Sequence, residues 1–441
     1  MTPTPQPLSR HQWIWFSLPV AILLFVVSLA PLSDGIGRSL PNSTSLPVGL
    51  ALVGFCLLVL TLGVVWAGRL GPATVFKPTV AFAFVVAPAW AGGVSTLSAL
   101  PPAGVRSMGE LSQWAFIIAV SMILVYVLAG SLRVSRRERP ARKTRVRFGP
   151  GAWRDAKDLT KLNLNGLVLV TTSIGFYMAA RAGFDGWLFA RALIGTGLVA
   201  CGSSALNQFM ERAEDARMPR TAGRPIPTGR VSPPAAMLMG VTLSIAGIAI
   251  LTLTVNLHAG FLAALTLAVY LFLYTPLKRI NTLSTLAGAI AGALPPVIGW
   301  VAGGGGNEPM AWTMFFVLFL WQIPHFLAIA WKYREQYGAA GFPMYAVLDP
   351  TGRATGATSV AYVVALVPVS LMPVLFGATG ALYAPCAAIL GLGFLWLAYR
   401  LYSRPTRERA TNLFLASIAY LPILLVLMIA DKAPMPPGPI L

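Results

Sequence analysis

Residues 187–225 read W-L-F-A-R-A-L-I-G-T-G-L-V-A-C-G-S-S-A-L-N-Q-F-M-E-R-A-E-D-A-R-M-P-R-T-A-G-R-P. Up to residue 206 the stretch is almost wholly apolar or small, and it is as long as the helix needed to cross the hydrocarbon core of a bilayer. From residue 207 it turns polar and holds three of the chain's 14 acidic residues. The stretch predicts a membrane-spanning helix that carries a charged cluster to one membrane surface.

The polar half has a helical spacing. Asn207, Glu211 and Asp215 stand at i, i+4 and i+8, so a continuing helix would place them on one face before Pro219 ends it. Oxygen ligands beside arginines suit a diphosphate bridged by Mg²⁺. The alternative, a solvated helix end with ordinary surface charges, stays open on spacing alone. Four arginines flank the three residues: Arg212, Arg217, Arg220 and Arg224.

Composition extends the membrane interpretation to the whole chain. Of the 441 residues, 56% are hydrophobic and 11% are charged, and the mean hydropathy is +0.71. A soluble protein would carry about a quarter charged residues. The apolar residues come in runs of about twenty rather than in the alternating pattern of a β-barrel. The sequence therefore predicts an all-α polytopic membrane protein.

Thirteen apolar runs are candidate spans. They lie near 12–32, 45–67, 78–100, 112–132, 162–182, 187–206, 234–255, 260–277, 284–302, 311–331, 358–377, 383–400 and 411–430. With the N-terminus in the cytoplasm, the segments on that side hold 28 of the 33 Lys and Arg residues. This positive-inside bias sets the orientation and places the charged loops discussed below in the cytoplasm.

The longest polar stretch divides the chain into three parts. We expect a four-helix transmembrane region of unknown role over 1–132, a basic cytoplasmic linker over 133–157, and a nine-helix domain over 158–441. The linker is most simply a topology signal and an anchor at the anionic leaflet of the lipid bilayer. No nucleic-acid partner is expected, because the interleaved aromatic residues that stack on bases are missing.

A second charged cluster follows the span 311–331. The two clusters end the second and the sixth helix of the nine-helix domain, which suggests two related four-helix halves and one closing helix, with a site at the repeat interface. The second cluster holds Lys332, Arg334, Glu335 and Tyr337.

A short cytoplasmic loop lies between these clusters. Its charges are Lys278 and Arg279, which follow Tyr274. The two cations would act either as point charges on a diphosphate or as an ordinary positive-inside pair. The Gly and Pro-Pro run within the next span, 284–302, is expected to break that helix or to let neighbouring helices approach closely.

At these residues the chain resembles a known family. The run Asn207-x-x-x-Glu211-Arg212-x-x-Asp215, continued by Arg220-Thr221-x-x-Arg224-Pro225, resembles the first motif of the protohaem IX farnesyltransferases (haem O synthases), within the intramembrane aromatic prenyltransferases. Stretches within 274–279, 292–300, 321–326 and 337–344 look like that family in the same order. The similarity covers about 158–430 and implies a nine-helix prenyltransferase bundle.

The resemblance also implies an activity and its residues. A farnesyl group would pass from farnesyl diphosphate to a vinyl group of haem b, at the inner membrane of a bacterium. Mg²⁺ would be held by Asn207, Glu211 and Asp215, with Glu335 in a second half-site. The catalytic set would be these first three residues together with Lys278, Arg220 and Arg224, which would stabilise the leaving diphosphate. Substrate would be bound by Tyr274, His325, Lys332, Arg334, Glu335 and Tyr337.

The chain departs from the family pattern in two motifs and in its extent. Gln336 stands where family members often carry an Asp, and Lys161-Leu162 stands where Lys-Pro is usual. The first four helices lie outside the resemblance. They do not suit a fused haem A synthase, because 12–132 holds no histidine to bind haem. Docking of haem-handling membrane proteins and simple stabilisation of the fold are both compatible with them.

Two rival functions stay open, and so does the role of His325. A prenyltransferase acting on a quinone precursor or chlorophyllide would share the metal site, although Pro324-His325-Phe326 favours the haem-modifying branch. A transporter of an anionic substrate would suit many Gly- and Pro-broken spans, but charge would be expected at mid-membrane rather than in the cytoplasm. His325 itself, inside a span, could be a haem axial ligand, a proton donor or a hydrogen-bonded core residue.

Overall fold

The structure is a computed structural model that describes residues 113–125, 151–181, 183–306 and 308–434. The predicted spans 12–32, 45–67 and 78–100 and most of the basic linker lie outside these residues. Of the span 112–132, the described part forms the apolar helix Gln113–Val125. The boundaries of the three predicted parts of the chain therefore remain predictions.

Within the described residues, nine helices are long and apolar enough to cross a membrane, and they match the nine spans predicted between 162 and 430. The described residues form helices and turns, apart from an isolated β-bridge between Thr379 and Lys432. The all-α prediction is confirmed. The spanning helices are α6 (Leu162–Ala179), α7 (Gly186–Met210), α9 (Pro233–Thr254), α10 (Leu257–Ala268) with its continuation, α12 (Ser284–Ala293) with α13 (Pro295–Ala302), α14 (Pro309–Lys332), α16 (Arg353–Leu375), α17 (Tyr383–Ser403) and α18 (Arg407–Ala430).

Two of these spans are interrupted. α10 continues as a π-helical segment, η1 (Val269–Tyr274), and then as the single turn α11 (Thr275–Leu277). Pro276 lies in that turn and cannot donate a backbone hydrogen bond, which favours such irregular winding. The break between α12 and α13 falls at Pro295 and Pro296, as the sequence suggests, because proline is tolerated in the first turn of a helix.

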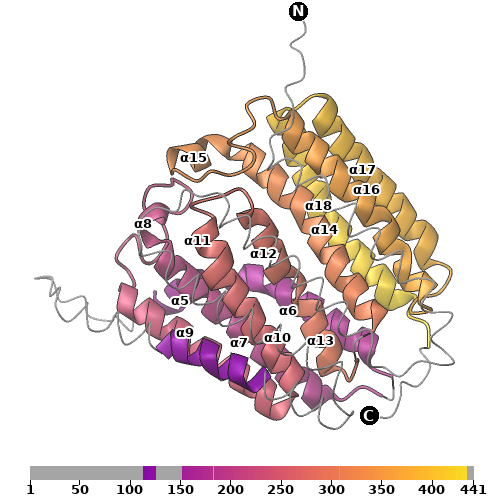
Figure 1. The fold of residues 1–441 in the computed structure, drawn as a ribbon, viewed down its shortest axis with the longest axis horizontal. Coiled ribbons are helices and arrows are strands. Elements are labelled where there is room, and N and C mark those ends of the chain that lie inside the picture. The colour runs from indigo at the N-terminus through magenta and orange to yellow at the C-terminus, as the bar shows by residue number, and fades with distance from the viewer. Residues whose placement is uncertain (1–112, 126–150, 182, 307, 435–441) are drawn as a thin grey trace, which may run out of the picture. The chain divides into compact units, whose positions relative to one another are not determined.

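The chain forms two compact units. Among the described residues, the first unit holds everything up to Glu308 together with 335–343, and the second holds 309–334 and 344–434. Figure 1 shows α5 (Ala152–Thr160) to α13 of the first unit in magenta to orange, and α16 to α18 of the second in orange to yellow. The helix Gln113–Val125 belongs to the first unit, where Phe116 meets Phe261 of α10 edge to face.

Glycines bring the helices of the first unit into direct backbone contact. A Cβ on Gly202 of α7 would lie 2.7 Å from the carbonyl oxygen of Gly240 of α9, and one on Gly240 would lie 3.1 Å from the carbonyl oxygen of Gly202. Gly195 and Gly247 make the same reciprocal contact two turns away. Small residues allow this close approach in membranes, where helix association depends on packing rather than on the hydrophobic effect.

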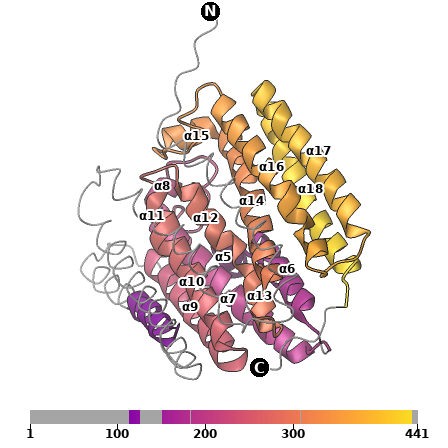
Figure 2. The ribbon, with the colours of Figure 1, turned by 45° about the vertical axis from the view of Figure 1, so that its right-hand side comes forward.

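The second unit is a bundle of four helices. α14 packs against α16 and α18, and α17 packs against α16 and α18; Figure 2 shows α16, α17 and α18 side by side. α14 is the most buried of the four and α17 the least. Ile389, Leu392 and Trp396 of α17 are exposed apolar side chains, which suits a surface in contact with lipid.

Candidate active site

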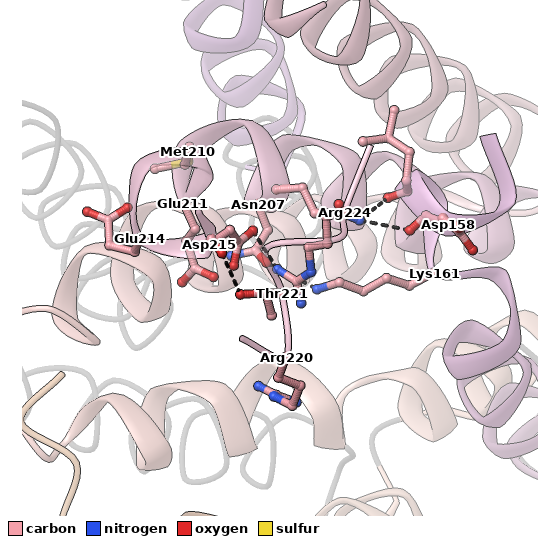
Figure 3. Close-up of polar contacts among 12 residues, drawn as sticks. Asp158, Lys161, Asn207, Met210, Glu211, Glu214, Asp215, Arg220, Thr221 and Arg224 are labelled. Carbon is pink, nitrogen blue, oxygen red and sulfur yellow. Dashed lines mark hydrogen bonds and ion pairs between the residues drawn. The ribbon is translucent and has the colours of Figure 1, made fainter. Parts of the chain in front are cut away.

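The predicted stripe lies at the end of α7. The helix ends at Glu211, which caps it, and a short helix α8 (Arg212–Asp215) follows. Helical hydrogen bonds continue across the break, since the Asp215 N–H bonds the Glu211 carbonyl. Asn207, Glu211 and Asp215 therefore stay together in space, as Figure 3 shows. Their exposed fractions are 2%, 2% and 4%. Burial of this degree contradicts the alternative of solvated surface charges.

Each of the three side chains is paired with a cation. Lys161 Nζ donates to Asn207 Oδ1 at 3.2 Å, and Lys278 Nζ donates to the Glu211 carboxylate at 3.1 Å. Arg224 donates to Asp215 Oδ2 at 2.6 Å. Charge-assisted hydrogen bonds of this kind are stronger than neutral ones and are needed where charges are buried. The paired cations are Lys161, Lys278 and Arg224.

The backbone at Lys161 is unusual. It separates α5 from α6 and adopts φ 50° and ψ 43°, and it is the one non-glycine residue with positive φ among the described residues. A side chain in this left-handed conformation costs about 1–2 kcal/mol, and such strain tends to gather at functional sites. Burial, and after it the positive charge of Arg224, lowers the pKa of Lys161 to about 8.

Sequence reasoning missed Lys161 as a site residue. The signal was its position immediately before an apolar run, at the place where the family usually has Lys-Pro. Eleven Lys and Arg residues lie within 133–161, however, and the positive-inside rule accounts for all of them equally. The contact with Asn207, 46 residues away, distinguishes Lys161 from the others.

The irregular winding of η1 and α11 positions the second cation. Thr275 donates its hydroxyl to the Tyr270 carbonyl and accepts a hydrogen bond from Asn207 Nδ2 at 3.2 Å. One turn later, Lys278 lies with its ammonium 4.9 Å from the ring centre of Phe342 and 5.9 Å from that of Tyr274. π-Helical turns are rare in proteins as a whole, and many of those that occur lie at functional sites.

The pKa values of the Lys278–Glu211 pair show that both groups are charged. Burial alone would lower the pKa of Lys278, but Tyr274 and Glu211 raise it above its ordinary value. Burial alone would raise the pKa of Glu211, but the charges of Lys278 and Lys161 outweigh it and hold the pKa below its usual range. The pair is therefore ionised at neutral pH.

Arg220 is held beside the second charged cluster. Its guanidinium donates to the hydroxyl of Tyr337 at 3.3 Å and lies 5.9 Å from the centre of that ring. Both residues belong to the first unit. Figure 3 shows Arg220 set apart from the row formed by Asn207, Glu211 and Asp215. Tyr337, a residue of the second charged cluster, therefore lies beside Arg220, which belongs to the loop that follows the first cluster.

The remaining residues of the second cluster are placed differently. Glu335, at the start of α15 (Arg334–Ala339), is exposed. Among the described residues, no three His, Cys, Asp or Glu side chains are grouped closely enough to hold a metal. The second half-site at Glu335 therefore stays a prediction. Gln336 has a buried Oε1 without a hydrogen-bond partner in the described part of the chain.

Lys332, Arg334 and His325 belong to the second unit. The Arg334 guanidinium lies 4.1 Å from the ring centre of Trp331, and the Lys332 ammonium lies 5.8 Å from that of Phe414. His325 is half-buried on α14, where its Nδ1 lies 2.7 Å from Ser417 Oγ of α18. Their predicted contact with substrate remains a prediction.

The residues of the row fit a magnesium–diphosphate complex. Asn207, Glu211 and Asp215 offer oxygen atoms, which are the ligands that Mg²⁺ prefers. The three cations paired with them are also donors that phosphate oxygens accept. The arrangement thus combines, in one buried row, the oxygen ligands and the cations that a metal–diphosphate complex requires.

Residues 168–421, more than half of the chain, match the UbiA prenyltransferase family. The chain belongs to this family and is a membrane-embedded prenyltransferase. It is 46% identical to the protoheme IX farnesyltransferase of Solibacter usitatus over 288 residues. This alignment covers 63% of this chain and 99% of that protein. It is 36% identical to the human mitochondrial protoheme IX farnesyltransferase, over 63% of this chain and 62% of that protein.

Solved structures agree on the fold. The chain matches the structure described for digeranylgeranylglyceryl phosphate synthase with a TM-score of 0.56 and 18% sequence identity, over 63% of this chain and 98% of that one. A UbiA homologue from Aeropyrum pernix K1 matches with a TM-score of 0.50 and 20% identity, over 61% and 98%. At this identity the likeness concerns architecture alone.

Proposed function

We propose that the chain transfers the farnesyl group of farnesyl diphosphate to a vinyl group of haem b and so makes haem O. The observation that carries the diphosphate half of the proposal is the buried row of Asn207, Glu211 and Asp215, each bonded to its own cation. The names of the relatives, protoheme IX farnesyltransferases at 36% to 46% identity, support haem b as the acceptor.

Mg²⁺ is the metal that this oxygen-rich row would take, through Asn207, Glu211 and Asp215. When bound, it would neutralise part of the diphosphate charge and make that group easier to displace. Lys161, Lys278 and Arg224 hold these oxygens in place through hydrogen bonds. A row held in this way would need little reorganisation during the reaction.

The cations stabilise the leaving group. As the bond between C1 of the farnesyl chain and the diphosphate oxygen breaks, negative charge grows on the diphosphate. Lys278 and Arg224 already lie beside Glu211 and Asp215, and Arg220 is held near the same loop by Tyr337. Fixed positive charges at the place where charge develops are commonly the largest contribution of an enzyme to such a step.

The second half of the reaction forms the carbon–carbon bond. It needs no nucleophilic side chain, but the allylic cation must be protected from early capture by water. The allylic cation left on farnesyl is captured by the electron pair of the haem vinyl group, which forms a carbon–carbon bond. Water then adds a hydroxyl group to the resulting cation and releases a proton. The rings of Tyr274 and Phe342 lie beside the Lys278 ammonium, where aromatic faces favour neighbouring positive charge.

The proposal includes an orientation. The row lies where α7 meets the polar loop 216–232, and the positive-inside bias puts that loop in the cytoplasm. The substrates would therefore be engaged from the cytoplasmic face of a bacterial inner membrane. We also propose haem-handling membrane proteins as its partners at this membrane.

Expression in a cell that lacks haem O tests the proposal. Mass analysis of extracted haems should find haem O when the chain is present, and purified protein should form it from haem b and farnesyl diphosphate. Removal of Mg²⁺ with a chelator should stop both diphosphate release and haem O formation, and added Mg²⁺ should restore them. A prenylated quinone precursor with no haem O would overturn the choice of acceptor.

A further inference from the structure

His325 and Ser417 form a hydrogen bond between α14 and α18, inside the second unit. His325 Nδ1 lies 2.7 Å from Ser417 Oγ. The Ser417 hydroxyl is also 2.6 Å from the backbone carbonyl of Phe414, one turn earlier on α18. Two oxygen atoms at 2.6 Å need a proton between them, and the carbonyl has none. The single hydroxyl proton of Ser417 is therefore used in the bond to Phe414.

This geometry determines the tautomer of the histidine. Since Ser417 has no second proton to give, the bond to His325 is made by the proton on Nδ1, with Ser417 Oγ as the acceptor. In a neutral imidazole, a proton on Nδ1 leaves Nε2 with its lone pair. Within the described residues, Ser417 is the hydrogen-bond partner of the ring. Nε2 is thus an available electron-pair donor on a half-buried side chain.

The surroundings favour a flat ligand with acidic groups. Trp321 stacks on His325 with ring centres 5.1 Å apart, and Phe414 lies at the same distance. Lys332 lies two turns further along α14, about 10 Å along the helix axis, and its ammonium is 5.8 Å from the Phe414 ring centre. A nitrogen lone pair, aromatic faces and a cation match the iron, the ring and the propionates of a haem.

We propose that Ser417 is a positioning residue for the haem substrate, because its hydroxyl fixes His325 in the tautomer whose Nε2 binds the haem iron. The inference rests on the proposed function for the identity of the acceptor. It adds a residue that contacts no substrate and acts through His325. Partners of this kind orient metal-binding histidines, and their loss typically weakens metal affinity about 10–100-fold.

The experiment is a binding titration of the purified full-length protein without farnesyl diphosphate. Haem b is added to the wild type and to the variants His325→Ala, Ser417→Ala and Ser417→Thr, and iron ligation is followed by absorption and magnetic circular dichroism. Metal-free protoporphyrin IX, followed by its fluorescence, is titrated in parallel. Ser417→Ala removes only Oγ and keeps the backbone carbonyl that accepts the Trp321 Nε1–H bond, so the two helices stay joined.

Ser370→Ala is a matched control. Ser370, in α16 of the same unit, also bonds its hydroxyl to the carbonyl three residues earlier, and its own carbonyl accepts a hydrogen bond from an aromatic side chain, Tyr383. It differs in not bonding a histidine.

We expect histidine-ligated haem in the wild type, loss of that signature in His325→Ala, and affinity for haem b about 10–100-fold weaker in Ser417→Ala. Ser417→Thr should restore the wild-type spectrum, because a threonine hydroxyl can make the same bond to an earlier carbonyl. Metal-free protoporphyrin should bind Ser417→Ala as tightly as the wild type, and Ser370→Ala should behave as the wild type towards both probes.

Three results would overturn the inference: unchanged haem affinity and spectrum in Ser417→Ala, a wild-type spectrum without histidine ligation, or an equal loss of affinity for haem and for the metal-free porphyrin. The last would show that Ser417 acts through ring packing. A failure of the proposed function can be distinguished from a failure of this inference. A wild type that makes haem O without a histidine-ligated complex disproves only the role of Ser417, whereas a wild type that makes no haem O disproves the function itself.

Discussion

Lys278 and Glu211 form a buried ion pair, with Nζ 3.1 Å from one carboxylate oxygen and 3.2 Å from the other. The side chains are 14% and 3% exposed. The pair joins the end of α7 to the turn α11, which follows it by 67 residues. If one of these two buried side chains were removed, the charge of the other would have neither its partner nor water around it. We expect the pair to have a structural role and, under the proposed function, a catalytic role, and variants can separate the two.

Lys278→Met should reduce haem O formation about 10²–10³-fold, because a charge on the leaving group is lost. It should also lower the free energy of unfolding by up to about 3–5 kcal/mol, because Glu211 remains buried and unpaired. Adding Glu211→Gln should recover the thermal unfolding midpoint, since no lone charge is left, while activity stays lost. If the double variant regained activity, the pair would be structural only.

Asp215→Ala should abolish haem O formation while the protein remains in the membrane at normal levels. The adjacent acid Glu214 provides the control, because it bonds Arg279 at the surface. Glu214→Ala should change both stability and activity little, since exposed ion pairs contribute about 0–1 kcal/mol. Mass analysis of haems and immunoblots of membranes measure the two effects. Undiminished haem O in Asp215→Ala would remove this residue from the metal site.

Lys161→Gly and Lys161→Ala remove the same ammonium group but differ in the backbone. At φ 50° an alanine keeps the steric clash of its Cβ, whereas glycine does not. The glycine variant should therefore be more stable than the alanine variant by about 1–2 kcal/mol, and both should bind farnesyl diphosphate more weakly than the wild type. Unfolding midpoints and a diphosphate-binding assay test this. Equal stabilities would mean that the left-handed turn is not strained.

Gly175→Ala should destabilise the protein strongly. A Cβ at this position of α6 would overlap the carbonyl oxygen of Pro296, which is backbone and cannot move aside. Gly166 lies on the same helix, and a Cβ there would have no other atom within 4 Å. Gly166→Ala should be neutral or slightly stabilising, because alanine favours helix by about 1 kcal/mol over glycine. Similar unfolding midpoints for the two variants would show that α6 and α13 can separate without cost.

The nine spans between 162 and 430 and the grouping of the row could be predicted from the sequence, because both depend on local patterns. Apolar runs of sufficient length can form little else in a bilayer than helices, and the spacing of Asn207, Glu211 and Asp215 survives the break at Glu211. The cations that bond the row were harder to predict from the sequence. Lys278 could be proposed because its loop has few charges, but Lys161 was hidden among other basic residues, and its contact with Asn207 depends on how α6 and α7 pack.

Ser417 shows the other limit of prediction from sequence. A serine within an apolar helix usually bonds a carbonyl of its own helix, and the sequence around it gives no sign of a partner. The partner is His325, 92 residues away. π-Helical winding at Val269–Tyr274 was likewise not predicted, because Pro276 marks an irregularity without specifying its form.

The reciprocal glycine contacts between α7 and α9 have a consequence for the membrane around the protein. At Gly195 with Gly247 and at Gly202 with Gly240, no side chain separates the two backbones, so the helices lie closely against each other. A helix that does not match the thickness of the bilayer commonly tilts. We expect α7 and α9 to tilt together, which would keep the depth of Asn207 constant relative to the start of α9.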